Sequence, residues 1–423
     1  MNISHLHPAD QLVLYMQRIY DKGLTTTSGG NLSVMDGDGN IWITPAAIDK
    51  GSLTPQDIVC VRPDGTCIGP QRPSSELPFH KAVYTQRPEL KAVLHAHCPA
   101  LVSFSMARKL PSLEWLPALQ PVCGKIALAP YAAPGSQALG QAIGSAFAGG
   151  CHVAILENHG VCVAGTDLSD AFRRFESAEY AARLELLTRT PGIRPHSPEQ
   201  SSPPLSVFTE DPRLSLPSPE EQAARRELIA LIRRACDHDL ITSAMGTFSV
   251  RLPDGSFLIT PDPRDRAYLQ EEDLVRVLDG QAEPGKHPSS AAALHRLIYR
   301  LSPETHAILQ ACPLHAMAFA VTDLTFDPYT IPEAYVMLRD LRKFPQDVLP
   351  EALAAYLRPT NPAAVIQNDC AITTGGNLLQ AFDRLEVLEC TARSILDSLK
   401  LGGAVGITEQ EVAELKKVFH LPD

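Results

Sequence analysis

The sequence lacks an excess of positive charge, long apolar runs and closely spaced pairs of cysteines. Its 37 lysine and arginine residues are outnumbered by 48 aspartate and glutamate residues, and the net charge of −11 argues against nucleic acid or a membrane surface as a partner. No apolar run approaches the roughly 20 residues of a transmembrane helix, and the first residues do not carry the basic and apolar segments of a secretory signal. We therefore expect a soluble cytoplasmic protein.

The ten cysteines are scattered from Cys60 to Cys390, and none forms a C-x-x-C pair. This pattern argues against a disulfide framework and is typical of reduced thiols in a cytoplasm. Hydrophobic residues make up 44% of the 423 residues and charged residues 20%, as in ordinary globular proteins. The length is sufficient for two or three domains.

The chain contains an internal repeat. The matching segments, in order along the chain, are Ser28–Val34 with Ala244–Val250, Ile43–Pro45 with Ile259–Pro261, Pro73–His80 with Pro288–His295, Cys98–Pro99 with Cys312–Pro313, and Asn158 with Asn368. The offset between the two copies stays between 210 and 216 residues throughout. We therefore predict two copies of one domain, each of roughly 200 residues, joined head to tail.

A proline-rich segment separates the two copies. Residues 191–220 contain eight prolines and six serines and show no sustained apolar period, which is typical of an extended linker. Its end, Ser218-Pro219-Glu220-Glu221, has the pattern of a helix start, with a serine cap, a proline in the first turn and a glutamate that reaches back to the cap. We place the first domain at residues 1–190, the linker at 191–217 and the second domain at 218–423.

Each copy mixes helical and strand patterns. In the first copy, helical spacing covers residues 11–20, 77–85 and 167–187, whereas short apolar runs predict strands at residues 41–44, 92–95 and 153–156. Such alternation predicts an α/β fold in which helices cover a sheet.

Three histidines follow apolar, strand-like runs of the first copy. His95 and His97 are two residues apart, and since side chains at i and i+2 of a strand point to the same face, both imidazoles can reach one point. His159 follows the run at residues 153–156. A pair of this kind, taken alone, is more typical of polar residues at a strand end. Three imidazoles, however, are a suitable set for a catalytic zinc ion that keeps one position open.

Residues around two predicted turns offer further chemistry. Glu76 opens the helix that carries His80, where a glutamate is more often a cap than a catalyst. Four residues supply hydroxyl, amide and backbone donors of the kind that hold a phosphate, although turns favour the same residue types: Gly30, Asn31, Ser74 and Ser75.

The second copy serves as an internal control. Alignment on Cys98 and Cys312 places four residues without matching chemistry opposite the candidates: Ala291 opposite Glu76, Leu309 opposite His95, Ala311 opposite His97, and Asp369 opposite His159. In contrast, His80, Tyr84, Thr44, Asn158 and the paired serines keep their counterparts. We interpret the four residues that are lost together as one functional site and His80 as a structural histidine.

The first copy resembles the class II aldolase/adducin family. The resemblance rests on the following motifs: Ser28-Gly-Gly-Asn-Leu-Ser33, Ile43-Thr-Pro45, Pro73-Ser-Ser-Glu76, His95-Ala-His97, Asn158-His-Gly160 and the helix from Ala171 to Glu176. It implies two tandem α/β/α sandwich domains, the second degenerate and without metal ligands. It further implies one Zn²⁺ per chain in the first domain, with Mn²⁺ or Co²⁺ as alternatives, bound by His95, His97 and His159. Glu76 would be the acid/base, and a phosphate cradle would comprise Gly30, Asn31, Thr44, Ser74 and Ser75.

The same resemblance implies a function and an assembly. The function is a zinc-dependent lyase that cleaves a carbon–carbon bond of a small phosphorylated sugar or sugar acid through a metal-stabilised enediolate, as fuculose-phosphate aldolases or oxo-sugar-acid-phosphate decarboxylases do. A sugar-phosphate epimerase and a non-catalytic, adducin-like scaffold are the alternatives. The assembly is a homo-oligomer, namely a dimer that forms a pseudo-tetrameric ring.

One position departs from the family pattern. Fuculose-phosphate-type aldolases use a tyrosine of a neighbouring subunit as proton donor, whereas Trp115 stands near that position here. The corresponding region of the second copy contains Tyr335. Either Tyr335 completes a first-copy site across an interface, or it is a core or interface aromatic.

Overall fold

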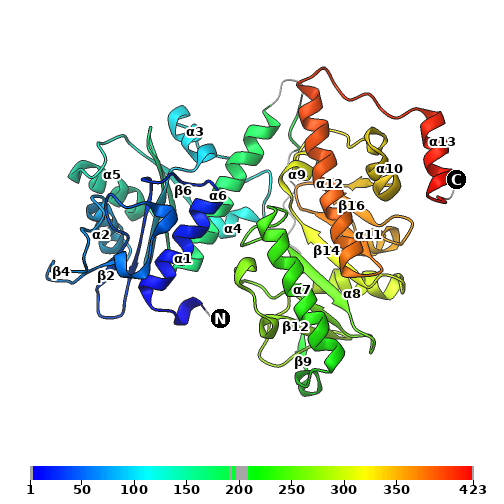
Figure 1. The fold of residues 1–423 in the computed structure, drawn as a ribbon, viewed down its shortest axis with the longest axis horizontal. Helices are drawn as coiled ribbons and strands as arrows, with labels where there is room; N and C mark the ends of the chain where they lie inside the picture. The colour runs from blue at the N-terminus through cyan, green and yellow to red at the C-terminus, as the bar shows by residue number, and fades with distance from the viewer. Residues whose placement is uncertain (1–2, 190–192, 197–207, 422–423) are drawn as a thin grey trace. The chain divides into compact units, whose positions relative to one another are not determined.

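The computed structural model describes residues 3–189, 193–196 and 208–421. The chain divides into two compact units, one formed by Met1–Leu113 with Ala118–Leu186 and the other by Glu114–Pro117 with Leu187–Asp423 (Figure 1). Residues 114–117 thus group with the second unit, although the sequence places them within the first copy. Each unit has its own sheet and its own apolar core.

The first unit is an α/β/α sandwich, as predicted. Its eight-stranded sheet has the order β4-β3-β2-β1-β5-β8-β7-β6, and all neighbours are antiparallel except β6 and β7. The strands are β1 Asn31–Met35, β2 Ile41–Ile43, β3 Val59–Val61, β4 Cys67–Ile68, β5 Ala92–Ala96, β6 Ile126–Ala129, β7 Val153–Leu156 and β8 Gly160–Gly165. The helices are α1 Pro8–Asp21, α2 Leu77–Gln86, α3 Pro99–Ala107, α4 Leu119–Cys123, α5 Gln137–Ala148 and α6 Leu168–Thr188, with 3-10 turns at Ile3–His5, Lys50–Ser52 and Pro55–Asp57.

Helices cover both faces of this sheet (Figure 1). Helices α2 and α5 bury Phe79 and Phe147 in one apolar cluster with strands of the sheet. On the other face α1 packs on α6, where the rings of Tyr15 and Phe172 lie 5.3 Å apart. The helices and strands predicted from periodicity are confirmed with ends that differ by a few residues, and the strand at 153–156 coincides with β7.

The second unit repeats this architecture. Its nine-stranded sheet has the order β15-β16-β17-β14-β10-β11-β12-β13-β9, so that its first eight strands follow the order β6-β7-β8-β5-β1-β2-β3-β4 of the first unit and β9 is added at the edge. The strands are β9 Thr209–Glu210, β10 Thr247–Arg251, β11 Phe257–Ile259, β12 Val275–Leu278, β13 Gln281–Ala282, β14 Ala307–Ala311, β15 Arg342–Phe344, β16 Ala363–Ile366 and β17 Ala371–Gly375. The helices are α7 Pro219–Asp237, α8 Ala292–Leu301, α9 Leu314–Ala320, α10 Pro332–Leu338, α11 Pro350–Tyr356, α12 Leu378–Leu399 and α13 Glu409–Val418, with 3-10 turns at Pro212–Ser215, Arg266–Tyr268, Glu271–Asp273 and Pro328–Thr330.

The end of the predicted linker is folded. Residues 190–192 and 197–207 lie outside the described residues, but β9 pairs in parallel with β13 and extends the second sheet. Ser218 caps α7 as predicted, because its hydroxyl accepts the amide of Glu221 at 3.2 Å. The carboxylate of Glu221 pairs with Arg225 at 2.6 Å and Arg276 at 2.9 Å in a buried ion-pair network, whereas the neighbouring Glu220 makes the return contact with the Ser218 side chain.

The sheet register corrects the alignment of the two copies. Asn31 pairs with His95, and its counterpart Thr247 pairs with Gln310. Gln310 therefore stands at the place of His95, and Leu309 does not. By the same shift of one residue, Cys312, and not Ala311, stands at the place of His97. The Cys-Pro dipeptide of the second unit lies one residue earlier relative to the sheet than that of the first unit. Cys98 is the N-cap of α3, whereas Pro313, and not Cys312, is the N-cap of α9.

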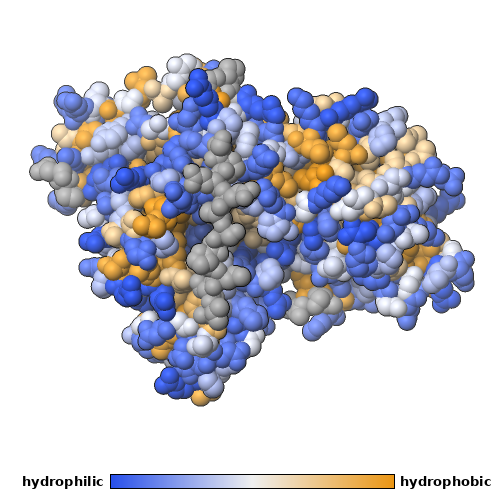
Figure 2. Space-filling model, turned by 180° about the vertical axis from the view of Figure 1, so that it is seen from behind, coloured by the Kyte–Doolittle hydropathy of each residue, from blue (hydrophilic) through white to orange (hydrophobic). Residues whose placement is uncertain are grey.

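The face seen in Figure 2 is mainly hydrophilic, with apolar residues in small separate groups. No helix in the described ranges combines the length and the apolar character that crossing a membrane requires.

Helix α3, which follows His97, is anchored by a buried carboxylate on α6. Glu179 is 3% exposed and accepts the amides of Ala100 at 3.0 Å and Leu101 at 2.9 Å. Glu389 makes the same contacts in the second unit, with the amides of His315 and Ala316. Burial raises the pKa of Glu179. The hydrogen bonds that its carboxylate accepts from the two amides must therefore offset the free-energy cost of removing the carboxylate from water.

We predict that Glu179→Ala destabilises the first unit by about 2 to 4 kcal/mol, because two buried amides lose their acceptor. Urea unfolding followed by circular dichroism measures this change. Glu89→Ala is the matched control, since the Glu89 side chain is 56% exposed beside Arg87 and its removal should leave the unfolding midpoint close to that of the unaltered protein. Equal midpoints for both variants would contradict the role of Glu179.

Candidate metal centre

Three histidines of the first unit converge on one point. Their nitrogen atoms, one from each of His95, His97 and His159, all lie within 4.8 Å of one another. The Nε2 atoms of His95 and His97 are 3.1 Å apart, and the ring centroids of His95 and His159 are 4.8 Å apart. Within the described residues this is the one group with the spacing of a metal site. The structure thus brings together the three ligands predicted from the sequence.

Two adjacent parts of the sheet carry these histidines. His95 lies in β5 and His97 directly after it, whereas His159 lies in the turn between β7 and β8. Strand β8 is hydrogen-bonded to both β5 and β7, so the sheet itself sets the separation of the rings.

Two glycines allow the backbone to approach the histidines closely. A Cβ atom on Gly30 would lie 2.7 Å from the His95 carbonyl oxygen, and φ at Gly30 is +74°. A Cβ atom on Gly160 would lie 2.6 Å from the carbonyl oxygen of Ala96 and 2.7 Å from Cδ2 of His97. Contacts this short exclude a side chain at either position. The sequence prediction included Gly30 as a phosphate contact and overlooked the steric role of Gly160.

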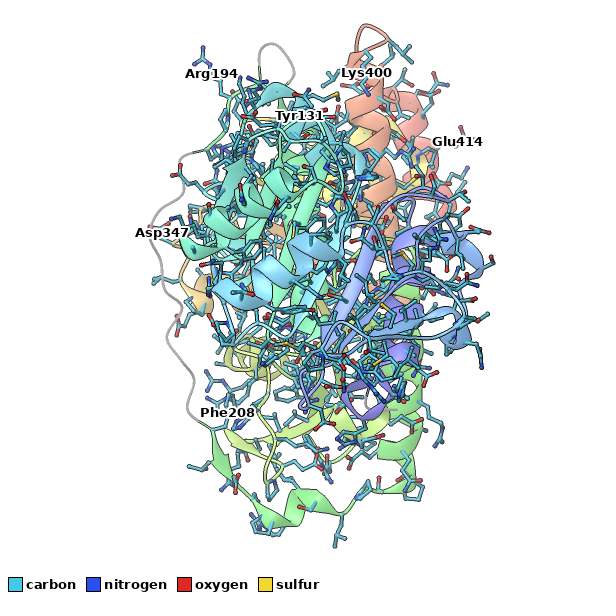
Figure 3. The ribbon with its side chains drawn as sticks, turned by 90° about the vertical axis from the view of Figure 1, so that its left-hand side faces the viewer. Tyr131, Arg194, Phe208, Asp347, Lys400 and Glu414 are labelled. Atoms are coloured by element: carbon cyan, nitrogen blue, oxygen red, sulfur yellow. The ribbon has the colours of Figure 1, made fainter. Side chains whose placement is uncertain are left out.

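The turn that carries His159 is held from outside the cluster. Asn158 adopts φ of 54°, as does Asn368 at the same place in the second unit. The carboxylate of Glu157 accepts the amide of Tyr131 at 3.3 Å, and Tyr131 lies at the surface (Figure 3). The His159 amide donates to the hydroxyl of Ser105 on α3 at 3.2 Å. These contacts orient His159 toward the other two rings.

Burial keeps the three imidazoles neutral. Desolvation, reinforced by His97 and His159, holds the pKa of His95 well below its usual value, and desolvation also lowers the pKa of His97 and of His159. Nδ1 of His95 donates to the Val161 carbonyl at 2.9 Å, because a carbonyl can only accept. Nε2 of His95 therefore presents a lone pair toward the cluster, which is the form that binds a metal ion.

Glu76 lies beside the histidines and not in a capping contact. It is the residue before α2, yet its side chain makes no capping hydrogen bond. Its Oε2 lies 3.3 Å from Nε2 of His95 and its Oε1 lies 3.6 Å from Nε2 of His159. Glu76 is 7% exposed. A buried carboxylate next to neutral imidazoles fits the acid/base role better than the helix-capping alternative.

A chain of buried hydrogen bonds fixes the orientation of Glu76. Asn31 Nδ2 donates to Glu76 Oε2 at 2.7 Å, and Asn31 Oδ1 accepts from His80 Nε2 at 2.5 Å. His80 Nδ1 contacts the Ser33 hydroxyl at 2.6 Å, which in turn contacts the Tyr84 hydroxyl at 2.7 Å. Desolvation lowers the pKa of His80 to about 3, so the ring is neutral and carries one proton.

The second unit contains the same histidine contacts, which supports a structural role for His80. Ser249, His295 and Tyr299 repeat the serine–histidine–tyrosine contacts at 2.8 and 2.7 Å. Thr247 stands in place of Asn31, and Ala291 in place of Glu76, so this copy lacks the link to a carboxylate. His80 is therefore architectural and also supports the residue that orients Glu76. A single sequence contains no signal for that second role.

The remaining predicted contacts surround the same turn. Thr44 is fully buried, and its hydroxyl accepts the Leu32 amide at 3.1 Å, as Thr260 accepts the Phe248 amide in the second unit. Ser74 accepts the Glu76 amide at 3.3 Å, whereas Ser75 is exposed. The side chain of Asn31 is occupied by Glu76 and His80. Of the predicted cradle, Ser75 thus has the most accessible side chain.

Tyr335 lies in the interior of its unit. It belongs to α10, is 2% exposed and has its ring centroid 5.1 Å from that of Tyr329. This environment supports the interpretation of Tyr335 as a core aromatic.

Comparison with known proteins places the chain in a family. The sequence model of the class II aldolase and adducin N-terminal domain matches residues 10–186 and again residues 226–396. The 3-oxo-tetronate 4-phosphate decarboxylase of Haemophilus influenzae is 31% identical over 189 residues, which cover 43% of this chain and 88% of that protein. The L-fuculose phosphate aldolase of Methanococcus maripaludis is 32% identical over 40% of this chain and 91% of its own length.

One solved structure is similar to this chain over about half of its length. The crystal structure of YgbL from Klebsiella pneumoniae is 31% identical, covers 46% of this chain and 94% of its own, and superposes with a TM-score of 0.42. The named relatives are lyases of phosphorylated substrates. Since the family's domain matches twice and together these matches span most of the sequence, the chain belongs to the class II aldolase and adducin N-terminal domain family and carries two copies of its domain.

Proposed function

We propose that the first unit is a zinc-dependent lyase that cleaves a carbon–carbon bond of a small phosphorylated sugar or sugar acid. The observation that carries this proposal is the convergence of three neutral imidazoles and one oriented carboxylate: His95, His97, His159 and Glu76. The relatives support the class of reaction, since they include both a decarboxylase and an aldolase that act on phosphorylated substrates.

The imidazoles fit a divalent ion. His95, His97 and His159 would hold Zn²⁺, and Mn²⁺ or Co²⁺ are alternatives, because nitrogen ligands suit several of these metals. When bound, the ion supplies Lewis acidity toward the oxygen atoms of the substrate. The three protein ligands of such a site leave a coordination position for the substrate.

Glu76 would move the proton. Retro-aldol cleavage requires a base that removes the proton of the substrate hydroxyl. Both retro-aldol cleavage and decarboxylation leave a carbanion that must later be protonated. Asn31 holds Oε2 of Glu76, whereas Oε1 has no hydrogen-bond partner among the described residues. Oε1 is therefore the oxygen that we assign to proton transfer. The substrate's anionic group would contact Gly30, Asn31, Thr44, Ser74 and Ser75, with Asn31 contributing through its backbone.

We predict one bound zinc ion per chain. His97→Ala should lose it, because the cluster then retains two imidazoles. The matched control is Cys312→Ala, which alters the corresponding position of the second unit and should leave one ion. Mass spectrometry of metals in the dialysed protein measures the ratio. Two ions in the unaltered chain would contradict the account of the second unit, and none would favour the scaffold alternative.

We predict that Glu76→Gln keeps its zinc and loses about 10²- to 10⁴-fold in kcat, since proton transfer by a positioned carboxylate contributes that much. Turnover of ketose 1-phosphates, followed by aldehyde release, and of oxo-sugar-acid phosphates, followed by CO₂ release, measures the loss and distinguishes the two reactions. Recovery of an epimer without cleavage would identify the epimerase alternative. Glu89→Gln, at an exposed position, should retain full activity, and equal rates for both variants would refute the role of Glu76.

A further inference from the structure

The second unit keeps the turn of the candidate anion cradle but places a carboxylate against it. Ser289 and Ser290 precede α8 as Ser74 and Ser75 precede α2. Oδ2 of Asp262 accepts the Ser290 amide at 3.0 Å and lies 3.4 Å from the Ser290 hydroxyl. An amide and a hydroxyl aimed at one oxygen are the donors that bind phosphate or carboxylate ligands.

A buried arginine binds the other oxygen of Asp262. Arg266 is 2% exposed, and its Nη2 donates to Asp262 Oδ1 at 2.7 Å. Its Nε and Nη1 are held by the carbonyl oxygens of Gly246 and Pro261, each at 2.7 Å. Burial alone would raise the pKa of Asp262, but Arg266 and the Ser290 amide hold it below the usual value. Asp262 is therefore an anion with a fixed donor on each oxygen, and its side chain is 39% exposed.

The first unit lacks this carboxylate at the same place. Ala46 follows Thr44-Pro45 as Asp262 follows Thr260-Pro261, and Lys50 stands where the second unit has Arg266. Lys50 is 3% exposed, and its Nζ donates to the Pro45 carbonyl at 2.9 Å. For the Ser75 amide and hydroxyl, no acceptor is found among the residues that the structure describes. The amide and hydroxyl of Ser290 thus contact the Asp262 carboxylate, whereas those of Ser75 contact no carboxylate among the residues that the structure describes.

We propose that Asp262 is a built-in substitute for an anionic ligand, which closes an oxyanion site of the second unit made by Arg266 and Ser290. The carboxylate satisfies the same donors that a phosphate or carboxylate group would use. The second unit consequently does not take up phosphorylated compounds, although its turn retains the necessary geometry. Without the carboxylate, Arg266 Nη2 and the amide and hydroxyl of Ser290 form a site for an oxyanion. This inference concerns the second unit and stands apart from the lyase activity of the first.

The test is the number of inorganic phosphate ions bound per chain, measured by equilibrium dialysis on the full-length protein. Asp262→Ala should bind one phosphate more than the unaltered chain, and the double variant Asp262→Ala/Arg266→Gln should lose it again. Alanine is the residue at the same place in the first unit. An unaltered chain that already binds phosphate in the second unit would overturn the proposal, as would a folded Asp262→Ala variant with no additional phosphate.

The reciprocal variant tests the equivalence of the two units without altering the second one. Ala46→Asp should place a carboxylate against Ser75 and weaken phosphate binding by the first unit at least tenfold, while the zinc content stays at one per chain. Unchanged phosphate affinity would overturn the proposal. This arm rests on the phosphate cradle of the proposed function, whereas the Asp262→Ala arm does not. Failure of the cradle would therefore remove phosphate from the unaltered chain and still leave the additional site in Asp262→Ala.

Discussion

The candidate site depends on the antiparallel pairing of β1 with β5. That register sets Asn31 opposite His95, and Gly30 allows the preceding turn to lie against the His95 carbonyl. The pairing delivers the amide of Asn31 to Glu76 and the imidazole of His95 to the other two histidines. A shift of one residue would turn each side chain to the opposite face of the sheet. Carboxylate and imidazoles thus meet because one pair of strands is held in register.

Buried polar groups in this site are tolerated because each is neutral or supplied with partners. His80 stays uncharged and connects Ser33 to Asn31, which leaves Asn31 a fixed donor for Glu76. The second unit retains the serine, histidine and tyrosine of this chain, but Thr247 stands in place of Asn31 and its hydroxyl pairs with that of Ser289 at 2.8 Å, so the chain does not continue to a carboxylate. The same serine–histidine–tyrosine contacts thus form in a unit that lacks the carboxylate, so their formation does not depend on Glu76.

The two units illustrate how one fold separates chemistry from architecture. Backbone features persist in both, including the left-handed asparagines Asn158 and Asn368 and the buried carboxylates Glu179 and Glu389. The residues that differ include those that can bind a metal ion or an anion, namely Glu76, His95, His97 and His159. Membership of the family accounts for the fold that both units share. The lyases among the relatives of this chain act on phosphorylated substrates.

The sequence by itself determined the duplication, the α/β class and the candidate ligands, because repeated motifs and apolar periods are local features. It identified His95 and His97 through the two-residue period of a strand. Only the tertiary structure decided that Gln310 and Cys312 replace them in the second unit, since strand register depends on distant pairing and a shared Cys-Pro dipeptide misaligned the copies. It also decided the link from His80 to Glu76 and the contact of Asp262 with Ser290, because these join residues that are far apart in the chain and meet only when the sheet has formed.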